Sequence, residues 1–401
     1  MIRISRRALL SGLAAGAAGA IFHKTVDAGP VVDPTQSPDS PKQRTEPHIK
    51  KYNELGKTGI EVSDVIFGAG ALYEPALIRY AYDRGVNAFD TAAGYSEGLS
   101  EEDIGNGLKG VREKCVIITK QGFSRRDPFD RKEVIRTLET SLKKLQSDYV
   151  DGLFIHSMDT PEALNNDELI ETFLRFKEEG KVRFTGFSTH DEDMALAECV
   201  KPKHEPFVDA VMLRYNHIEG GSIEPLIAQA NKKGIGTIAM KTLAGGKHDK
   251  LKEFVGDAMS YPQAAVAWVL SNRHIDCAVL SMDNYSLIDA YIGASGKRLE
   301  RNDQSLLRKY RDAVGATYCR VRCAACERAC PHGVSISDVM RYKMYFEDYG
   351  QEKKAITQYA AHDAAQKPTN CQNCSGPCTI ACPYGLRVQE QLVKAHQLLT
   401  V

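Results

Sequence analysis

Eight short apolar segments, alternating with stretches of helical periodicity, constrain the fold of this chain more than any other feature. The predicted strands are Val65–Ala69, Ala88–Thr91, Cys115–Lys120, Val150–His156, Arg183–Ser188, Ala210–Tyr215, Gly236–Lys241 and Cys277–Ser281. None of them alternates clearly between apolar and polar residues, which is typical of parallel strands buried on both faces. Helices are expected over Arg131–Gln146, Glu168–Glu179, Ile223–Lys233 and Pro262–Leu270.

Repetition of this strand–helix unit predicts an α/β fold, a (β/α)8 TIM barrel. The alternative is an open doubly wound sheet, which we disfavour because no G-x-G-x-x-G motif follows the first strand. Gly85, Gly180 and Gly234 stand just past the predicted helix ends, where a left-handed cap is expected.

Composition divides the 401 residues into four predicted segments. Residues 1–22 form a signal, 23–50 a disordered linker, 51–300 the barrel and 301–401 a small helical domain organised around metal. Hydrophobic residues make up 43% of the chain, as in ordinary globular proteins. The formal net charge is zero, so binding of nucleic acid through bulk electrostatics is not expected.

The first residues are typical of an export signal. Ser5-Arg6-Arg7 precedes an apolar run that is too short and too rich in Ala and Gly to favour a transmembrane helix. The paired arginines favour the twin-arginine route, which exports folded proteins; an ordinary secretory signal is the alternative. The expected location is therefore periplasmic or otherwise extracytoplasmic, with anchoring in the membrane if the signal stays uncleaved.

Eight cysteines near the end of the chain form two groups that each end in Cys-Pro. They are Cys319, Cys323, Cys326 and Cys330, then Cys371, Cys374, Cys378 and Cys382. Such thiolate spacing predicts two [4Fe–4S] clusters, in which the fourth cysteine of each group would ligate the other cluster. Disulfides and two zinc sites are the alternatives. Cys115, Cys199 and Cys277 are expected to be buried, small apolar residues.

Four polar residues fall at or just after the carboxyl ends of three predicted strands, where barrels of this kind carry their chemistry. They are Asp90, Tyr95, Lys120 and His156. A phenol can protonate a carbonyl oxygen that receives hydride, and a nearby ammonium lowers the pKa of the phenol. Asp90 would hold Lys120 charged, and His156 would hydrogen-bond and orient the carbonyl.

Several stretches of the sequence resemble the aldo-keto reductases. They are Leu55-Gly56-Lys57-Thr58-Gly59, Phe89-Asp90-Thr91-Ala92, Gly94-Tyr95-Ser96-Glu97, Ser100-Glu101-Glu102, Ile118-Thr119-Lys120 and Ile155-His156. The resemblance covers about Tyr52 to Ser295. It implies the barrel, a catalytic tetrad at the four residues above, and NADP(H) or NAD(H) as cofactor. The cysteine-rich end resembles a subfamily that appends a ferredoxin-type segment.

The residues that would bind the nicotinamide cofactor depart from the family pattern. Ser188 matches, but Thr189 stands where the family has Asn, and Met212 stands where it has Gln. Met240 replaces the aromatic ring that stacks on nicotinamide. Ser281 and Asn284 follow the last strand without the basic residue that usually grips the 2′-phosphate. We therefore expect a tightly held cofactor or a site adapted to another electron carrier.

Together these features predict an exported iron–sulfur oxidoreductase that acts on a small-molecule carbonyl or alcohol, with Tyr95 as general acid or base and a redox partner protein. Two alternatives stay open at this point. The chain could be an electron-transfer or interaction subunit whose barrel no longer turns over nicotinamide, or an enzyme whose clusters only stabilise its C-terminal part.

Overall fold

The computed structural model describes residues 46–400 apart from 71–73, 123–128, 159, 246–253, 255, 257–258, 316, 318 and 321–322. The predicted signal and residues 23–45 of the predicted linker lie outside the described residues. The chain divides into two units, Met1–Thr45 and Glu46–Val401, and all described residues belong to the second. No helix in the described part is both long enough and apolar enough to cross a membrane.

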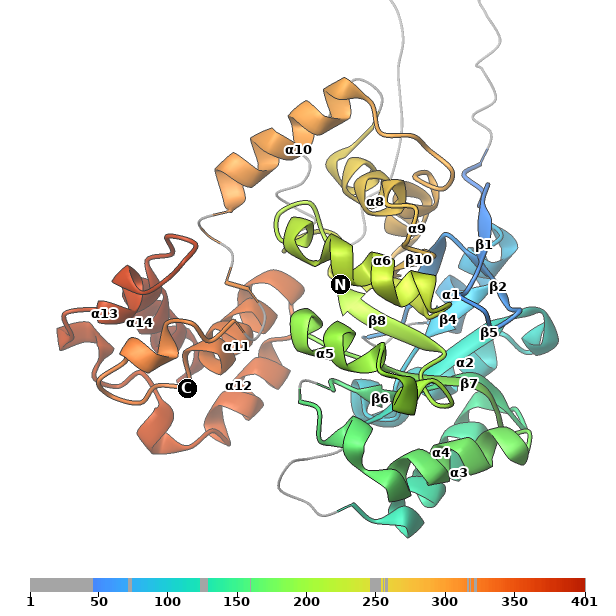
Figure 1. Ribbon diagram of the computed structural model, residues 1–401. Helices are drawn as coiled ribbons and strands as arrows, with labels where there is room; N and C mark the ends of the chain where they lie inside the picture. Colours follow the sequence, from blue (N-terminus) through green and yellow to red (C-terminus); the bar gives the residue numbers. More distant parts are fainter. Residues whose placement is uncertain are drawn as a thin grey trace, which may run out of the picture. The chain divides into compact units, whose positions relative to one another are not determined.

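Eight parallel strands close into a barrel in the order β10-β3-β4-β5-β6-β7-β8-β9 (Figure 1). They are β3 (Val65–Gly68), β4 (Ala88–Asp90), β5 (Val116–Gly122), β6 (Val150–His156), β7 (Val182–Ser188), β8 (Ala210–Arg214), β9 (Gly236–Met240) and β10 (Cys277–Ser281). Each agrees with a predicted strand to within two residues at either end, so the predicted barrel is confirmed. The hydrogen-bond ladder brings the carboxyl ends of all eight strands to one rim.

Eight helices of the described part of the chain surround the strands. They are α1 (Pro75–Asp83), α2 (Leu99–Gly107), α3 (Arg131–Leu145), α4 (Asp167–Glu178), α5 (Glu192–Cys199), α6 (Glu224–Lys232), α8 (Tyr261–Ser271) and α9 (Tyr285–Ile292). Asp130 caps the start of α3 by accepting from the Lys132 N–H. Gly85, Gly180 and Gly234 have the positive φ values expected of them.

Two apolar layers hold the barrel. Inside the strands, side chains such as Ile118, Phe154 and Phe184 fill the interior. Between strands and helices, a larger layer includes Leu138, Phe173 and other buried residues. Cys115, Cys199 and Cys277 are buried in these layers, as predicted. An antiparallel hairpin of β1 (Tyr52–Glu54) and β2 (Glu61–Ser63), which the sequence did not predict, precedes β3.

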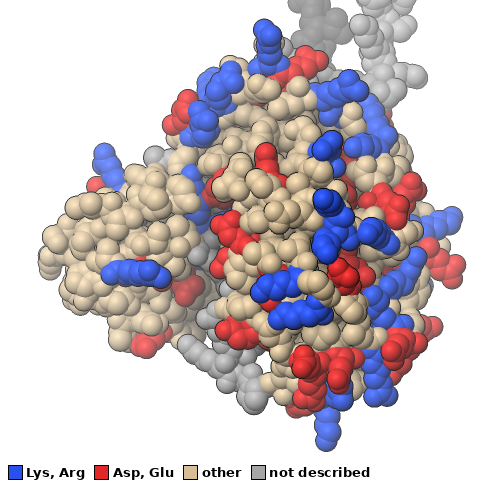
Figure 2. All heavy atoms as spheres, viewed as in Figure 1, with Lys and Arg blue, Asp and Glu red and all other residues tan. Residues whose placement is uncertain are grey.

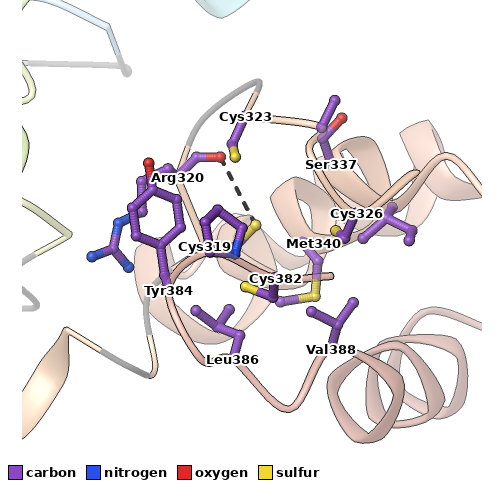
Figure 3. Close-up of a pocket in the computed structure, with 13 residues that line it drawn as sticks. Cys319, Arg320, Cys323, Cys326, Ser337, Met340, Cys382, Tyr384, Leu386 and Val388 are labelled. Carbon is purple, nitrogen blue, oxygen red and sulfur yellow. Dashed lines mark hydrogen bonds between the residues drawn. The ribbon is translucent and has the colours of Figure 1, made fainter. Parts of the chain in front are cut away.

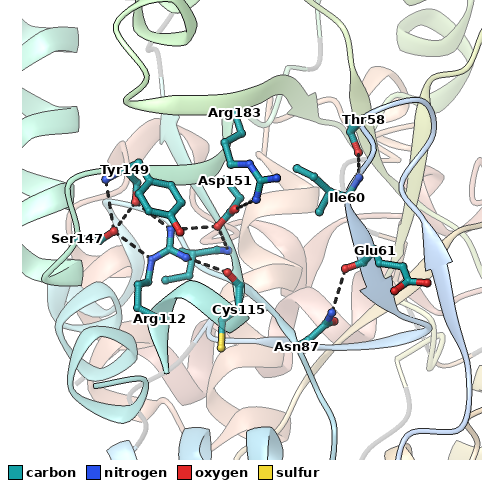
Figure 4. A network of polar contacts seen from close by, with 11 residues as sticks. Thr58, Ile60, Glu61, Asn87, Arg112, Cys115, Ser147, Tyr149, Asp151 and Arg183 are labelled. Carbon is teal, nitrogen blue, oxygen red and sulfur yellow. Dashed lines mark hydrogen bonds and ion pairs between the residues drawn. The ribbon is translucent and has the colours of Figure 1, made fainter. Parts of the chain in front are cut away.

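A buried carboxylate ties three strands together at the amino end of the barrel (Figure 4). Asp151 of β6 accepts a hydrogen bond from the Ile117 N–H of β5 at 2.9 Å. It also pairs with Arg112 at 3.0 Å and with Arg183 of β7 at 2.8 Å. Because this network lies at the end opposite the rim, it stabilises the barrel without entering the chemistry.

After the barrel, α10 (Arg301–Val314) packs on α8 through a cluster that includes Tyr261, Leu306, Leu307 and Tyr310. The chain then forms four further helices, α11 (Ile336–Tyr349), α12 (Glu352–Ala360), α13 (Pro377–Ile380) and α14 (Val388–Leu399). We call residues 319–400 the cysteine module. Its small core combines side chains of α11, α12 and α14 with Cys326, Cys371 and Cys378.

Candidate active site

Three neighbouring strands and one loop place the four predicted catalytic side chains together at the carboxyl rim. Asp90 ends β4, Lys120 lies near the end of β5 and His156 ends β6. Tyr95 begins a short 3-10 turn, Tyr95–Gly98, in the loop after β4. That loop is fixed to β5 because the Ala93 N–H donates to the Lys120 carbonyl at 3.0 Å.

Asp90 and Lys120 form a buried ion pair of 2.5 Å. The Lys120 side chain is 1% exposed, and its ammonium also donates to the Thr91 carbonyl at 2.8 Å. Burial alone would lower the pKa of Lys120, but the charges and hydrogen bonds of Asp90 and Tyr95 together outweigh burial and hold this pKa above its ordinary value. Lys120 is therefore a fixed cation at the rim.

The Tyr95 ring lies between this cation and the imidazole. The Lys120 ammonium is 4.8 Å from the centre of the Tyr95 ring, and the His156 ring packs edge-on against it at 5.3 Å between ring centres. Burial raises the pKa of Tyr95, and Lys120 opposes that shift. The lysine thus acts in the expected direction, but burial outweighs it. The phenol therefore keeps its proton at neutral pH and can donate it.

The rim opens into a cavity of about 1390 Å³. Every strand of the barrel contributes at least one residue to the lining, namely Gly68, Asp90, Lys120, His156, Ser188, Met212, Met240 and Ser281. Tyr95 lines the same space. A cavity of this size holds a small substrate together with part of a larger cofactor.

The cysteine module forms the opposite wall of the cavity. Its lining residues include Met340, Arg341, Tyr342 and Tyr345 of α11, Lys354 and Gln358 of α12, and Lys394 and Leu398 of α14. Tyr345 lies near enough to Tyr95 to affect its pKa. At the edge, Arg320 pairs with Glu219 of the β8–α6 loop at 2.9 Å, with only 4% of the Arg320 side chain exposed. The lining of the cavity is thus shared between barrel and module.

The predicted cofactor residues fall into two classes. Ser188, Met240 and Ser281 line the cavity. Thr189 does not: it is fully buried, and its hydroxyl accepts from the Asp191 N–H at 2.9 Å. Asn284 caps α9 by accepting from the Leu287 N–H at 3.0 Å. The side chains of Thr189 and Asn284 therefore hydrogen-bond to nearby backbone N–H groups.

Sequence reasoning did not assign a role to three cavity residues, Lys241, Arg341 and Tyr345. Lys241 directly follows β9 and was considered only as the end of a strand. Arg341 and Tyr345 belong to the cysteine module, and no sequence signal indicates that its α11 faces the rim. Their position depends on how two parts of the chain pack, which periodicity does not report.

The eight clustered cysteines lie in two sets of four. Cys319, Cys323, Cys326 and Cys382 line one small cavity, together with Arg320, Met340 and Tyr384 (Figure 3). Burial raises the pKa of the Cys371 thiol to about 11, and the charges that raise it further are those of Cys330, Cys378 and Cys374. Each set therefore takes three cysteines from one group and one from the other, which is the crossed grouping considered above.

All eleven cysteines are described, and none forms a disulfide. Among the described residues, no group of three or more His, Cys, Asp or Glu side chains is arranged around a single metal ion. The thiolates of an iron–sulfur cube bind four different irons, so they stand farther apart than the ligands of one ion. Each set therefore offers four thiols, the number that one [4Fe–4S] cluster takes.

Comparison with known proteins points to one family. The model of the Aldo/keto reductase family matches residues 73–260, a stretch that ends before the cysteine module. L-galactose dehydrogenase from Arabidopsis thaliana is 28% identical over 278 residues, which cover 60% of this chain and 86% of that protein. A probable aldo-keto reductase 1 from Glycine max is 31% identical over 212 residues, which cover 48% of this chain and 59% of that protein.

Solved structures share the barrel. A holo aldo-keto reductase from Bacillus halodurans has a TM-score of 0.54 at 22% identity, covering 65% of this chain and 96% of its own. A thermostable aldo-keto reductase crystallised with the inhibitor epalrestat has a TM-score of 0.54 at 25% identity, covering 65% of this chain and 99% of its own. The first of these likenesses concerns the fold alone.

Proposed function

We propose that this chain is an oxidoreductase of the aldo/keto reductase family, one that interconverts a carbonyl compound and its alcohol with two iron–sulfur clusters as electron carriers. The observation that carries the proposal is the meeting of Tyr95, Lys120 and His156 in a cavity whose opposite wall is the cysteine module.

The chemistry at the rim is proton transfer. When a carbonyl carbon is reduced, negative charge develops on its oxygen. The Tyr95 hydroxyl donates its proton to that oxygen, and the Lys120 ammonium stabilises the phenolate that remains. Asp90 keeps Lys120 cationic and in place. His156, which packs against the Tyr95 ring, orients the carbonyl oxygen by a hydrogen bond.

Aldo-keto reductases use NAD(P)H, which supplies hydride when bound. In this chain Ser188 and Ser281 would contact its polar groups, and Met240 would pack against the nicotinamide ring from the rim. All three residues line the cavity beside Tyr95, so they fit the reactive end of the cofactor. Thr189 and Asn284, engaged elsewhere, are left out of this proposal.

The two sets of four cysteines would each hold one [4Fe–4S] cluster, which stores and passes single electrons. Cys319 lines both its own cavity and the substrate cavity, so the set that contains it is the nearer one to the chemistry. The second set would exchange electrons with a redox partner protein. Export through the twin-arginine signal, with the clusters already inserted, completes the proposal and would place the protein outside the cytoplasm.

Turnover of the Tyr95→Phe variant tests the proposed role of the phenol. Loss of the hydroxyl removes the proton donor, so kcat/KM for carbonyl reduction should fall by about 10²- to 10⁴-fold. Tyr342→Phe is the matched control because Tyr342 lines the same cavity from α11. The measurement uses the anaerobically purified full chain and a chemical reductant. Equal rates in the Tyr95→Phe and wild-type proteins would contradict the proposal.

Two observations favour a second candidate function. The side chains of Thr189 and Asn284 hydrogen-bond to the local backbone. Met212 and Met240 occupy positions where the family has Gln and an aromatic ring. Both observations favour a barrel that has lost nicotinamide turnover. The chain would then be an electron-transfer or interaction subunit. Equilibrium titration with NADPH separates the two: tight binding by the purified chain excludes this candidate, and its absence favours it.

A further inference from the structure

Glu101 is a buried carboxylate that the chemistry proposed above does not use. It lies in the first turn of α2, the helix that begins directly after the Tyr95 turn, and only 1% of the residue is exposed. One of its oxygens accepts a hydrogen bond of 2.6 Å from the Thr119 hydroxyl of β5. Thr119 is fully buried and is the chain neighbour of Lys120. This hydrogen bond therefore joins α2 to the strand that carries the cation.

Burial of the Glu101 carboxyl carries a cost. Burial raises its pKa, and the hydrogen bond from Thr119 opposes that shift, as do the charges of Lys144 and Lys120. An apolar side chain would fill the same space without that cost. We therefore expect the hydrogen bond between Glu101 and Thr119 to fix the position of α2 more closely than apolar packing would.

The loop between β4 and α2 carries Tyr95 near its middle, and side chains close it at its base. The Ser100 hydroxyl donates to the Ala69 carbonyl at 2.6 Å, so it accepts from the Thr91 hydroxyl, 2.8 Å away. Thr91 and Ser100 are fully buried. The Thr91 carbonyl also accepts from the Lys120 ammonium at 2.8 Å. The start and the end of the loop are therefore held together beside the cation.

Strand β5 holds both ends of the same loop. At the start of the loop, the Ala93 N–H donates to the Lys120 carbonyl at 3.0 Å. At the end, Glu101 accepts from the Thr119 hydroxyl. Two consecutive residues of β5 thus fix the loop, and one of them also supplies the ammonium that faces the Tyr95 ring.

The backbone of the loop is strained next to the phenol. Ser96 has a φ of 52°, in the left-handed region that serine rarely adopts. Such strain in a non-glycine residue persists only where the surrounding structure holds the backbone. The Tyr95 N–H also donates to the Ala92 carbonyl at 3.0 Å, which closes the turn. The direction of the Tyr95 ring therefore depends on the anchoring of the loop at its two ends.

We propose that Glu101 is a positioning residue for Tyr95: its hydrogen bond with Thr119 fixes the end of the loop to β5 and so holds the phenol beside the Lys120 ammonium. That ammonium lies 4.8 Å from the centre of the Tyr95 ring. A displacement of about 1 Å at a reacting group is enough to slow a reaction strongly. The consequence for catalysis rests on the proposed function, in which Tyr95 is the proton donor, whereas the placement of the ring does not.

Fluorine NMR of the full-length, anaerobically purified protein with 3-fluorotyrosine in place of Tyr95 tests this inference. The protein with Glu101 intact should give one sharp resonance. Glu101→Leu should shift and broaden that resonance, and carbonyl reduction in the assay used for Tyr95→Phe should fall about tenfold or more. Glu101→Gln keeps an acceptor oxygen for Thr119 and should retain the resonance. Thr119→Val removes the donor and should reproduce the effect of Glu101→Leu.

Asp151→Asn is the matched control, because Asp151 is a buried carboxylate at the opposite end of the barrel. It should lower the free energy of unfolding and leave the fluorine resonance unchanged. Three outcomes would overturn the inference: an unchanged resonance in Thr119→Val, a resonance in Glu101→Gln as perturbed as in Glu101→Leu, or the same perturbation in Asp151→Asn. Circular dichroism checks that each variant is folded, and Thr119→Val decides the matter if Glu101→Leu does not fold.

Failure of this inference and failure of the proposed function give different results. If Tyr95→Phe turns over normally while Glu101→Leu and Thr119→Val displace the resonance, the proposed function fails and the positioning role stands. If Tyr95→Phe loses turnover while both variants keep the resonance, the proposed function stands and the positioning role fails.

Discussion

The barrel and the cysteine module are stabilised in different ways. The barrel has two apolar layers and buried ion pairs between its own side chains, such as Asp151 with Arg112. The module has one small core, in which 3 of 14 buried residues are cysteines. On the face seen in Figure 2, charged side chains of both signs crowd the barrel and are sparse on the module. A core this small usually needs a metal or disulfides, so we expect the stability of the module to depend on what its thiols bind.

Substitution of a module cysteine should give the largest effect. Cys326→Ser removes one thiolate of the set that lines the cavity in Figure 3, so we expect loss of that cluster and faster proteolysis of residues 319–400 by about tenfold or more. Iron and acid-labile sulfide should fall from about eight of each per chain.

Cys199→Ala is the matched control, because Cys199 is a buried cysteine of the barrel. It should leave iron content and the protease resistance of the module unchanged. If Cys326→Ser keeps its full iron content and its protease resistance, the fold of the module, like that of the barrel, does not depend on this cysteine. If the clusters cannot be reduced reversibly, their role is structural.

The second prediction concerns the ion pair at the rim. Asp90→Asn leaves the buried Lys120 ammonium without its partner, so the free energy of unfolding of the barrel should fall by about 3–5 kcal/mol. The exposed pair of Glu133 and Arg136 offers the comparison, and Glu133→Gln should cost less than about 1 kcal/mol. Urea unfolding followed by circular dichroism measures both. Equal losses in the two variants would show that the rim pair adds no more than a surface pair.

A smaller, pH-dependent effect is expected where the barrel meets α10. His217 donates to or accepts from the Tyr261 hydroxyl at 3.0 Å and packs beside Tyr310 of α10. Burial lowers the pKa of His217 to about 4. The unfolded chain therefore binds more protons than the folded chain between pH 6.5 and 4, and stability is present above pH 6.5 and lost as the pH falls.

Across this pH interval the titration of His217 should change the free energy of unfolding by up to about 2–3 kcal/mol, and solvent screening reduces that figure. His217→Phe should flatten that part of the stability profile relative to the wild type, while the loss from other titrating groups stays common to both proteins. Chemical unfolding at a series of pH values measures the difference. Parallel profiles would mean that His217 has similar pKa values in the folded and unfolded chains.

The sequence predicts the barrel well because buried parallel strands are continuous apolar runs, which are visible without any knowledge of packing. The exact ends of strands are less predictable because they depend on backbone hydrogen bonds to the neighbouring strand. β5 extends past Lys120 because Gln121 and Gly122 pair with β6. The short hairpin of β1 and β2 lacks an apolar run, so no periodicity reveals it.

The candidate site residues also differ in how well the sequence predicts their position. Asp90, Tyr95, Lys120 and His156 follow strand ends, and strand ends meet at one rim, so their convergence is predictable from order alone. Thr189 and Asn284 were expected in the cofactor site but bond to nearby backbone N–H groups, an alternative that short polar side chains often take.

The ion pair between Arg320 and Glu219 has a consequence for maturation. Arg320 is the chain neighbour of Cys319, so the same short segment that would ligate a cluster also fastens the module to the barrel. If the module folds only around its clusters, cofactor insertion and closure of the reaction chamber become a single step of assembly. A chain without iron would then keep a formed barrel whose cavity lacks the wall that the module supplies.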